Sequence, residues 1–166
     1  MERKIYADLL KWKKDSNRKP LLIYGNKQIG KTYTAIEFGK REYKTVSYIN
    51  SDNNLELLKI MQKERTIDKI IAKLSLLTGE SILKNDTLII IDNVIDDDIV
   101  KAVKKFGKEP NDYHIIMITS LKEKLLTFKG EELQYKYMFP MDFEDSVRSY
   151  CPLSLMDFIK SSYRSN

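Results

Sequence analysis

Cysteine is nearly absent from the chain: Cys151 is the only one among 166 residues. A single cysteine can form neither an internal disulfide nor a cysteine-rich metal site, which is typical of proteins in a reducing cytoplasm. No stretch approaches the roughly 20 apolar residues needed to cross a bilayer, and Met1–Lys4 leads into no apolar segment of signal-peptide type. We therefore expect a soluble, cytoplasmic protein that does not span a membrane.

Internal repeats, low-complexity tracts and linkers rich in proline, glycine or serine are also lacking. Hydrophobic residues make up 42% and charged residues 32%, a balance typical of one globular domain. The sequence predicts a single domain over residues 1–166. Within it we expect an N-terminal helix and linker at 1–19 and a C-terminal helical end at 142–166.

The net charge of +5 is unevenly distributed. Residues 1–20 contain seven basic and three acidic side chains, a local balance of +4. Such an excess could attract nucleic acid or an acidic partner. It is also typical of a solvated helix face and of the mild positive field that favours phosphate binding. Because no known nucleic-acid-binding module accompanies the charge, the second interpretation is favoured.

Short apolar runs alternate with segments of helical periodicity along the chain. Strands are predicted at 20–24, 45–50, 87–92, 114–120 and within 133–139. Helices are predicted at 2–15, 30–40, 54–63, 66–78, 97–106, 142–150 and 153–161. On the helix at 54–63 we expect Leu55, Leu58 and Ile60 to form the apolar face. Strands that are apolar throughout and alternate with helices predict an α/β fold with a parallel sheet between two helical layers.

The segment Gly25–Thr32 matches the P-loop pattern G-x-x-x-x-G-K-[ST] and lies between a predicted strand and a predicted helix. In such a loop, backbone N–H groups and the helix N-terminus converge on phosphate oxygens. Lys31 is expected to reach the β- and γ-phosphates of a nucleoside triphosphate, and the Thr32 hydroxyl to bind Mg²⁺. The predicted nucleotide-binding residues are Gly25, Asn26, Lys27, Gln28, Ile29, Gly30, Lys31, Thr32 and Tyr33.

An acidic residue at the end of a neighbouring strand completes the Mg²⁺ shell in P-loop enzymes. The strand at 87–92 ends in Asp92, which we predict to be that ligand together with Thr32. ATPases of this arrangement usually have a glutamate next, which polarises the attacking water, but Asn93 occupies the position here. An amide cannot accept a proton, although it can orient a water. Residues 96–98 are aspartates that could substitute, but they more simply suit a helix N-terminus.

The predicted strand at 114–120 contains two further residues to which we assign a role. Ser120, at its end, is predicted to contact the γ-phosphate or the water, with an ordinary strand-ending serine as the alternative. His114, the only histidine, begins the strand at the opposite end from the nucleotide. We therefore expect His114 to be structural.

These residues give the chain a resemblance to prokaryotic AAA-type ATPases that join an N-terminal ATPase domain to a C-terminal domain of unknown function, often nuclease-like. The resemblance covers about residues 5–150. Its segments are 18–25, 28–33, 37–43, 48–50, 87–92, 113–116 and 140–144, the last being Pro-Met-Asp-Phe-Glu and the most specific. The resemblance implies ATP as the nucleotide and a five-stranded sheet in the order 5-1-4-3-2.

The sequence departs from that family at two points. Asn93 replaces the glutamate, and the sequence given ends at Asn166, before the family's C-terminal domain. Two interpretations are consistent with this: the chain is a domain excised from a longer protein, or it is a natural, truncated and degenerate member of the family. If an arginine from a neighbouring subunit is needed, Arg148 and Arg164 are candidates by residue type.

Four functions are consistent with the sequence. The first is an ATP- and Mg²⁺-binding AAA-type domain with weak or absent hydrolysis, a conformational or assembly module that binds a second copy or another protein. The others are a competent ATPase that uses another water-positioning residue, a small-molecule kinase, and a nucleic-acid binder switched by ATP. The kinase ranks lower because residues 97–130 contain no arginine cluster for a phosphate lid.

Overall fold

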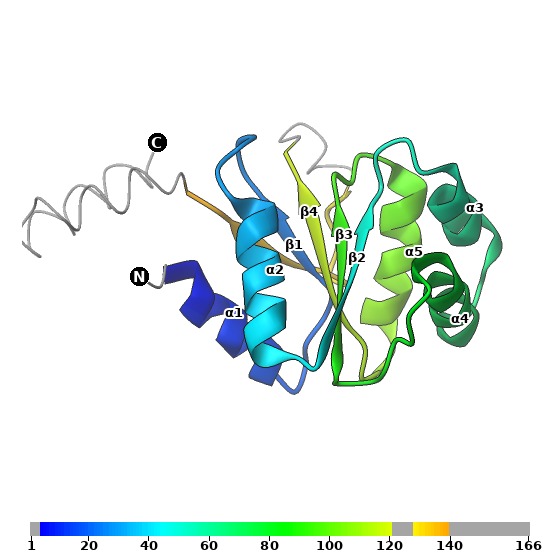
Figure 1. The fold of residues 1–166 in the computed structure, drawn as a ribbon, viewed down its shortest axis with the longest axis horizontal. Helices are drawn as coiled ribbons and strands as arrows, with labels where there is room; N and C mark the ends of the chain where they lie inside the picture. The colour runs from blue at the N-terminus through cyan, green and yellow to red at the C-terminus, as the bar shows by residue number, and fades with distance from the viewer. Residues whose placement is uncertain (1–3, 121–127, 140–166) are drawn as a thin grey trace, which may run out of the picture.

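The computed structural model describes residues 4–120 and 128–139. Its centre is a parallel sheet of five strands in the order β2-β3-β4-β1-β5, which confirms the predicted order read from the other edge (Figure 1). The strands are β1 (Leu21–Tyr24), β2 (Thr45–Asn50), β3 (Thr87–Asp92), β4 (His114–Thr119) and β5 (Gln134–Tyr137). The helices predicted at 142–150 and 153–161 lie outside the described residues, as do Cys151, Arg148 and Arg164.

Helices cover both faces of this sheet (Figure 1). They are α1 (Lys4–Lys14), α2 (Lys31–Glu42), α3 (Leu55–Lys63), α4 (Ile67–Thr78) and α5 (Asp97–Lys108). Side chains along β3 and β4 alternate between two apolar clusters, one beneath α1 and α2 and the other beneath α3, α4 and α5. All six residues of β3 and all six of β4 are buried. The apolar runs in the sequence therefore reflect cover on both sides of the sheet, as predicted.

The apolar face of α3 differs from the prediction. Leu57 and Met61, four residues apart, are its buried side chains, while Leu58 and Ile60 are only partly buried. Leu55 is 69% exposed, so its predicted place on the buried face was wrong. Residues four apart lie on the same side of a helix, and here the Leu57–Met61 side faces α4 and α5.

His114 is structural in the sense predicted, because it is buried at the amino end of β4. Its Nε2 lies 3.1 Å from Asn85 Oδ1, and its Nδ1 lies 2.6 Å from the Tyr43 hydroxyl. Since an amide oxygen only accepts, Nε2 carries the hydrogen and Nδ1 accepts the hydrogen bond from Tyr43. Burial, assisted by the charges of Arg18 and Lys13, lowers the pKa of His114 to about 3.

The carboxyl ends of the parallel strands lie at one edge of the sheet. The registers pair Tyr24 with Thr119 and Asn50 with Asp92. The loops that follow these residues therefore meet at this edge, where ligands usually bind in open α/β sheets.

Candidate nucleotide-binding site

The phosphate loop turns from β1 into α2 through Gly25 and Gly30. Gly30 is the N-cap of α2 in a left-handed conformation, with φ 91° and ψ 19°, which glycine adopts without strain. A Cβ on Gly25 would lie 2.7 Å from the Met138 carbonyl oxygen and 2.8 Å from the Ile29 side chain. Both glycines are thus required by this turn, and the backbone N–H groups at the start of α2 have no intrahelical partners.

Lys31 is the charged residue at the centre of the loop and is only 5% exposed. Its ammonium donates to the carbonyl oxygens of Gly25 at 3.1 Å and Asn26 at 2.5 Å. Burial lowers the pKa of Lys31, and the nearby Asp92 carboxylate opposes that effect. The loop therefore holds a cation whose partners in this structure are neutral carbonyl groups.

Asp92 ends β3 directly opposite the loop and is 4% exposed. Its Oδ2 accepts hydrogen bonds from the Thr32 hydroxyl at 2.7 Å and from the Tyr48 hydroxyl at 2.6 Å. Its Oδ1 accepts the backbone N–H of Asn93 at 2.9 Å. Burial, together with the hydrogen bond to Asp92, raises the pKa of Tyr48. The predicted pair of Thr32 and Asp92 is thus in direct contact, although 60 residues separate them.

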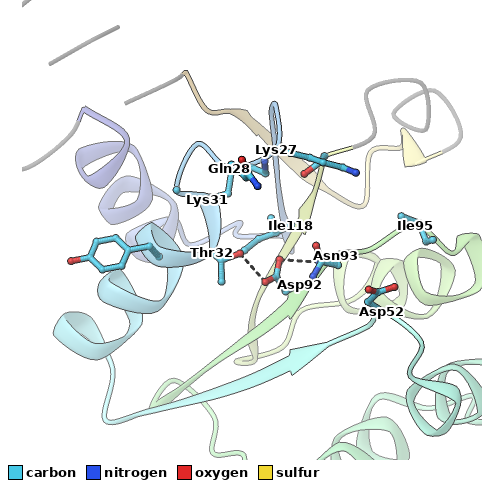
Figure 2. Close-up of a pocket in the computed structure, with 12 residues that line it drawn as sticks. Lys27, Gln28, Lys31, Thr32, Asp52, Asp92, Asn93, Ile95 and Ile118 are labelled. Atoms are coloured by element: carbon cyan, nitrogen blue, oxygen red, sulfur yellow. Dashed lines mark hydrogen bonds between the residues drawn. The ribbon is translucent and has the colours of Figure 1, made fainter. Parts of the chain in front are cut away.

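A cavity of about 650 Å³ opens between the phosphate loop and the ends of β3 and β4 (Figure 2). Nine of the predicted site residues line it, namely Lys27, Gln28, Gly30, Lys31, Thr32, Tyr33, Asp92, Asn93 and Ser120. Gly25, Asn26 and Ile29 belong to the loop but are not among the lining residues. The structure therefore brings residues predicted to bind phosphate, metal and water to one cavity.

Sequence reasoning missed four residues at this site. Asp52, Ile95 and Ile118 line the cavity, and Tyr48 supports Asp92 from behind. Asp52 could have been found, because β2 ends at Asn50 beside the end of β3 and the loop that follows must face the same edge.

Asn93 adopts a left-handed backbone conformation with φ 57°. The side-chain amide of Asn93 donates to Asn50 Oδ1 at 3.0 Å. The backbone carbonyl oxygen of Asn93 accepts from the Ser51 hydroxyl at 2.7 Å. Asparagine tolerates this conformation better than most residues with a Cβ. The amide is therefore engaged by the neighbouring loop.

The aspartates at 96–98 begin α5, which confirms their interpretation as a helix N-terminus. Asp96 is the N-cap, and its carboxylate accepts the backbone N–H of Asp98 at 2.9 Å. The Asp98 carboxylate accepts from the Gln62 amide at 2.9 Å. None of the three is among the residues that line the cavity.

The donor set fits Mg²⁺. No group of three or more His, Cys, Asp or Glu side chains that could hold a metal ion occurs within residues 4–120 and 128–139. Asp92 and Thr32 supply one carboxylate and one hydroxyl oxygen instead. Mg²⁺ commonly uses one or two carboxylates and completes its shell with water and substrate phosphates. The site thus suits a metal that arrives with a phosphorylated ligand.

A family model for the AAA domain matches residues 17–147, most of the chain. The chain belongs to this family. The match includes the phosphate loop, Asp92 and all five strands, so the site described above is that of a P-loop ATPase-type domain. A comparison with curated proteins found no match.

Solved structures share the fold of this AAA domain. The Aeropyrum pernix ORC1 protein in complex with DNA has a TM-score of 0.54 at 13% identity, covering 89% of this chain and 46% of that one. Drosophila ORC bound to AT-rich DNA and Cdc6 has a TM-score of 0.52 at 8% identity, covering 83% of this chain and 55% of that one. The chain thus spans about half the length of these relatives, and identities this low show the fold alone.

Across the part of the chain that the structure describes, none of the helices has both the length and the apolar character needed to cross a membrane.

Proposed function

We propose that this AAA domain binds ATP with Mg²⁺, hydrolyses it slowly, and serves as a conformational or assembly module. One observation carries the proposal: a single cavity is lined by both the phosphate-loop lysine, Lys31, and the hydrogen-bonded pair of Thr32 and Asp92. These are the groups that phosphate and Mg²⁺ require; Lys31 and Thr32 come from the start of α2, and Asp92 comes from the end of β3.

In the proposed complex, the ammonium of Lys31 leaves the carbonyls of Gly25 and Asn26 for the charged β- and γ-phosphate oxygens. The anionic phosphate oxygens are better partners for the ammonium than neutral carbonyl oxygens, because the attraction between opposite charges adds to the hydrogen bond. The backbone N–H groups of the loop and of the first turn of α2 donate to the same phosphates. Tyr33 lines the cavity and is 65% exposed, and we expect it to contact the nucleotide beyond the phosphates.

Thr32 and Asp92 would hold Mg²⁺, with the remaining ligands from phosphate and water. The bound metal would neutralise charge on the phosphates. Within this chain, Tyr48 and the N–H of Asn93 fix the orientation of the Asp92 carboxylate before any ligand arrives.

Slow turnover is expected because Asn93 occupies the position at which ATPases of this arrangement usually have a glutamate. The amide cannot take a proton from water, so this position supplies no general-base catalysis, which typically contributes 10²–10⁴-fold to rate. Ser120 lies across the cavity at the end of β4 and can orient a water or a phosphate oxygen by hydrogen bonds.

We propose a second copy or another protein as the partner, in the cytoplasm. Nucleic acid is less favoured because three of the basic residues near the N-terminus make internal hydrogen bonds. Lys13 donates to the Glu42 carbonyl, Arg18 to the Lys13 carbonyl, and Lys19 to the Gly107 carbonyl. The DNA in the titles of the similar structures belongs to those proteins.

The proposal is tested by titrating the chain with ATP in the calorimeter, with Mg²⁺ and with EDTA, and by measuring phosphate release. We expect saturable binding that Mg²⁺ strengthens, and turnover well below about 1 s⁻¹, the low end of ordinary enzymes. An absence of binding at millimolar ATP would contradict nucleotide binding. Turnover at or above about 1 s⁻¹ would instead identify a competent ATPase.

A further inference from the structure

The loop after β2 is tied to the end of β3 by a chain of hydrogen bonds. Ser51 N–H donates to the Asp92 carbonyl at 2.9 Å, and the Ser51 hydroxyl donates to the Asn93 carbonyl at 2.7 Å. In the opposite direction, the Asn93 amide donates to Asn50 Oδ1 at 3.0 Å. The segment at 50–54 and the residue that replaces the usual glutamate therefore form one local unit.

This unit fixes the backbone of Asp52. Asn50 Oδ1, the acceptor for Asn93, also accepts the backbone N–H of Asp52 at 3.0 Å. Asn54 donates from its side chain to the Asn50 carbonyl at 3.1 Å and then caps α3 by accepting the N–H of Leu57. Asp52 is thus held between the end of a strand and the start of a helix rather than in a long free loop.

The Asp52 side chain lines the same cavity as Lys31, Thr32 and Asn93. In Figure 2, Asp52 and Asn93 enter that cavity from neighbouring loops. Of the carboxylates that line the cavity, Asp92 is buried and accepts hydrogen bonds from Thr32, Tyr48 and Asn93. Asp52 is exposed, so its carboxylate is accessible to water in the cavity.

We propose that Asp52 is the general base for the ATP hydrolysis that this domain retains, and that Asn93 positions it. The inference rests on the proposed function. A water oxygen attacks the γ-phosphorus while the bond from that phosphorus to the β,γ-bridging oxygen breaks. One water proton passes to the Asp52 carboxylate, ADP leaves with the bridging oxygen, and inorganic phosphate forms.

The backbone explains why the carboxylate is at 52 and not at 93. Asn93 has φ 57°, where a glutamate would be strained, and its N–H₂ group is required as a donor to Asn50. A carboxylate at 93 cannot donate, so it would release the loop that carries Asp52. The amide at 93 and the carboxylate at 52 therefore depend on each other.

The first test compares Asp52→Asn with the wild-type chain in ATP calorimetry and in phosphate release. We expect release to fall at least tenfold while the dissociation constant for Mg²⁺–ATP stays within about threefold, because general-base catalysis acts on the transition state and contributes 10²–10⁴-fold. Asp52→Glu keeps a carboxylate and should retain more activity than Asp52→Asn. Asp97→Asn is the matched control: it removes the same charge from the neighbouring exposed helix start and should change neither quantity.

A double-mutant cycle tests the positioning role. Asn50→Ala removes the acceptor shared by Asn93 and Asp52 without altering a residue that lines the cavity. It should lower phosphate release several-fold in the wild-type background and have no further effect in the Asp52→Asn background. A purely structural role for Asn50 would lower both backgrounds equally.

The outcomes separate this inference from the proposed function. If Mg²⁺–ATP binds but Asp52→Asn releases phosphate as fast as wild type, or if wild-type release does not exceed the protein-free blank, the role of Asp52 is refuted and nucleotide binding stands. If the wild-type chain does not bind ATP at all, the proposed function fails and Asp52 has no substrate to act on.

Discussion

Acidification from pH 7 to pH 5 should destabilise the fold through His114. The buried imidazole is neutral, with Nδ1 accepting from Tyr43 and Nε2 donating to Asn85. Burial, and then the nearby charges of Arg18 and Lys13, disfavour the protonated imidazole and lower the pKa of His114 to about 3. Protonation would also remove the acceptor for the Tyr43 hydroxyl. In the unfolded chain the same group has a pKa of about 6.5.

The magnitude follows from linkage. A lowered pKa in the folded state means that the unfolded chain binds the extra proton, so the stabilisation is complete above pH 6.5 and is lost as the pH falls towards 3. At about 1.4 kcal/mol per pH unit once the unfolded histidine is protonated, the loss between pH 7 and pH 5 is about 2 kcal/mol. This value depends mainly on the unfolded pKa, because the folded group stays neutral throughout that range.

The assay is urea unfolding at pH 7 and pH 5 for the wild-type chain and for His114→Gln. Since His114 is the only histidine, the difference between the two pH dependences isolates its contribution from that of the carboxylates. We expect the wild-type chain to lose about 2 kcal/mol more than the variant over this interval. Equal losses would refute the buried, neutral histidine.

Three further variants test the site and the packing. Asp92→Ala should weaken ATP binding in Mg²⁺ while leaving binding in EDTA nearly unchanged, measured by calorimetry; equal losses in both would indicate a folding defect at the strand end. Tyr48→Phe removes a hydrogen bond to the Asp92 carboxylate and should lower the free energy of unfolding in urea by about 1.5–3 kcal/mol, and an unchanged value would rule out that contact. Gly107→Ala would place a Cβ 1.8 Å from the Glu132 carbonyl oxygen and should cost at least about 2 kcal/mol; a neutral result would show that this packing is looser.

The sheet and the phosphate loop could be predicted because their signals are local. β3 and β4 are continuous apolar runs, and the P-loop pattern lies between β1 and α2. The contact of Thr32 with Asp92 also follows, because both lie at the carboxyl edge of a parallel sheet.

The remaining site residues depend on features that the pattern does not encode. Tyr48 reaches Asp92 because β2 and β3 pair in parallel with Asn50 opposite Asp92. Tyr48 lies two residues before Asn50 on β2, and its hydroxyl donates to the Asp92 carboxylate. Asp52 enters the cavity from a loop that the side chains of Asn50, Ser51 and Asn93 hold by hydrogen bonds, and Asn93 itself has a left-handed backbone conformation. Such contacts form only when two strands distant in sequence are brought together.

The central claim, that the loop around Lys31 binds the phosphates of ATP, is tested most directly by calorimetry of Lys31→Ala. Loss of the buried ammonium should weaken Mg²⁺–ATP binding at least tenfold, about 1.4 kcal/mol. Lys44→Ala, which removes an exposed lysine paired with Asp86 on the surface, should bind as the wild type does. Equal affinity of the wild-type and Lys31→Ala chains would contradict the phosphate-loop assignment.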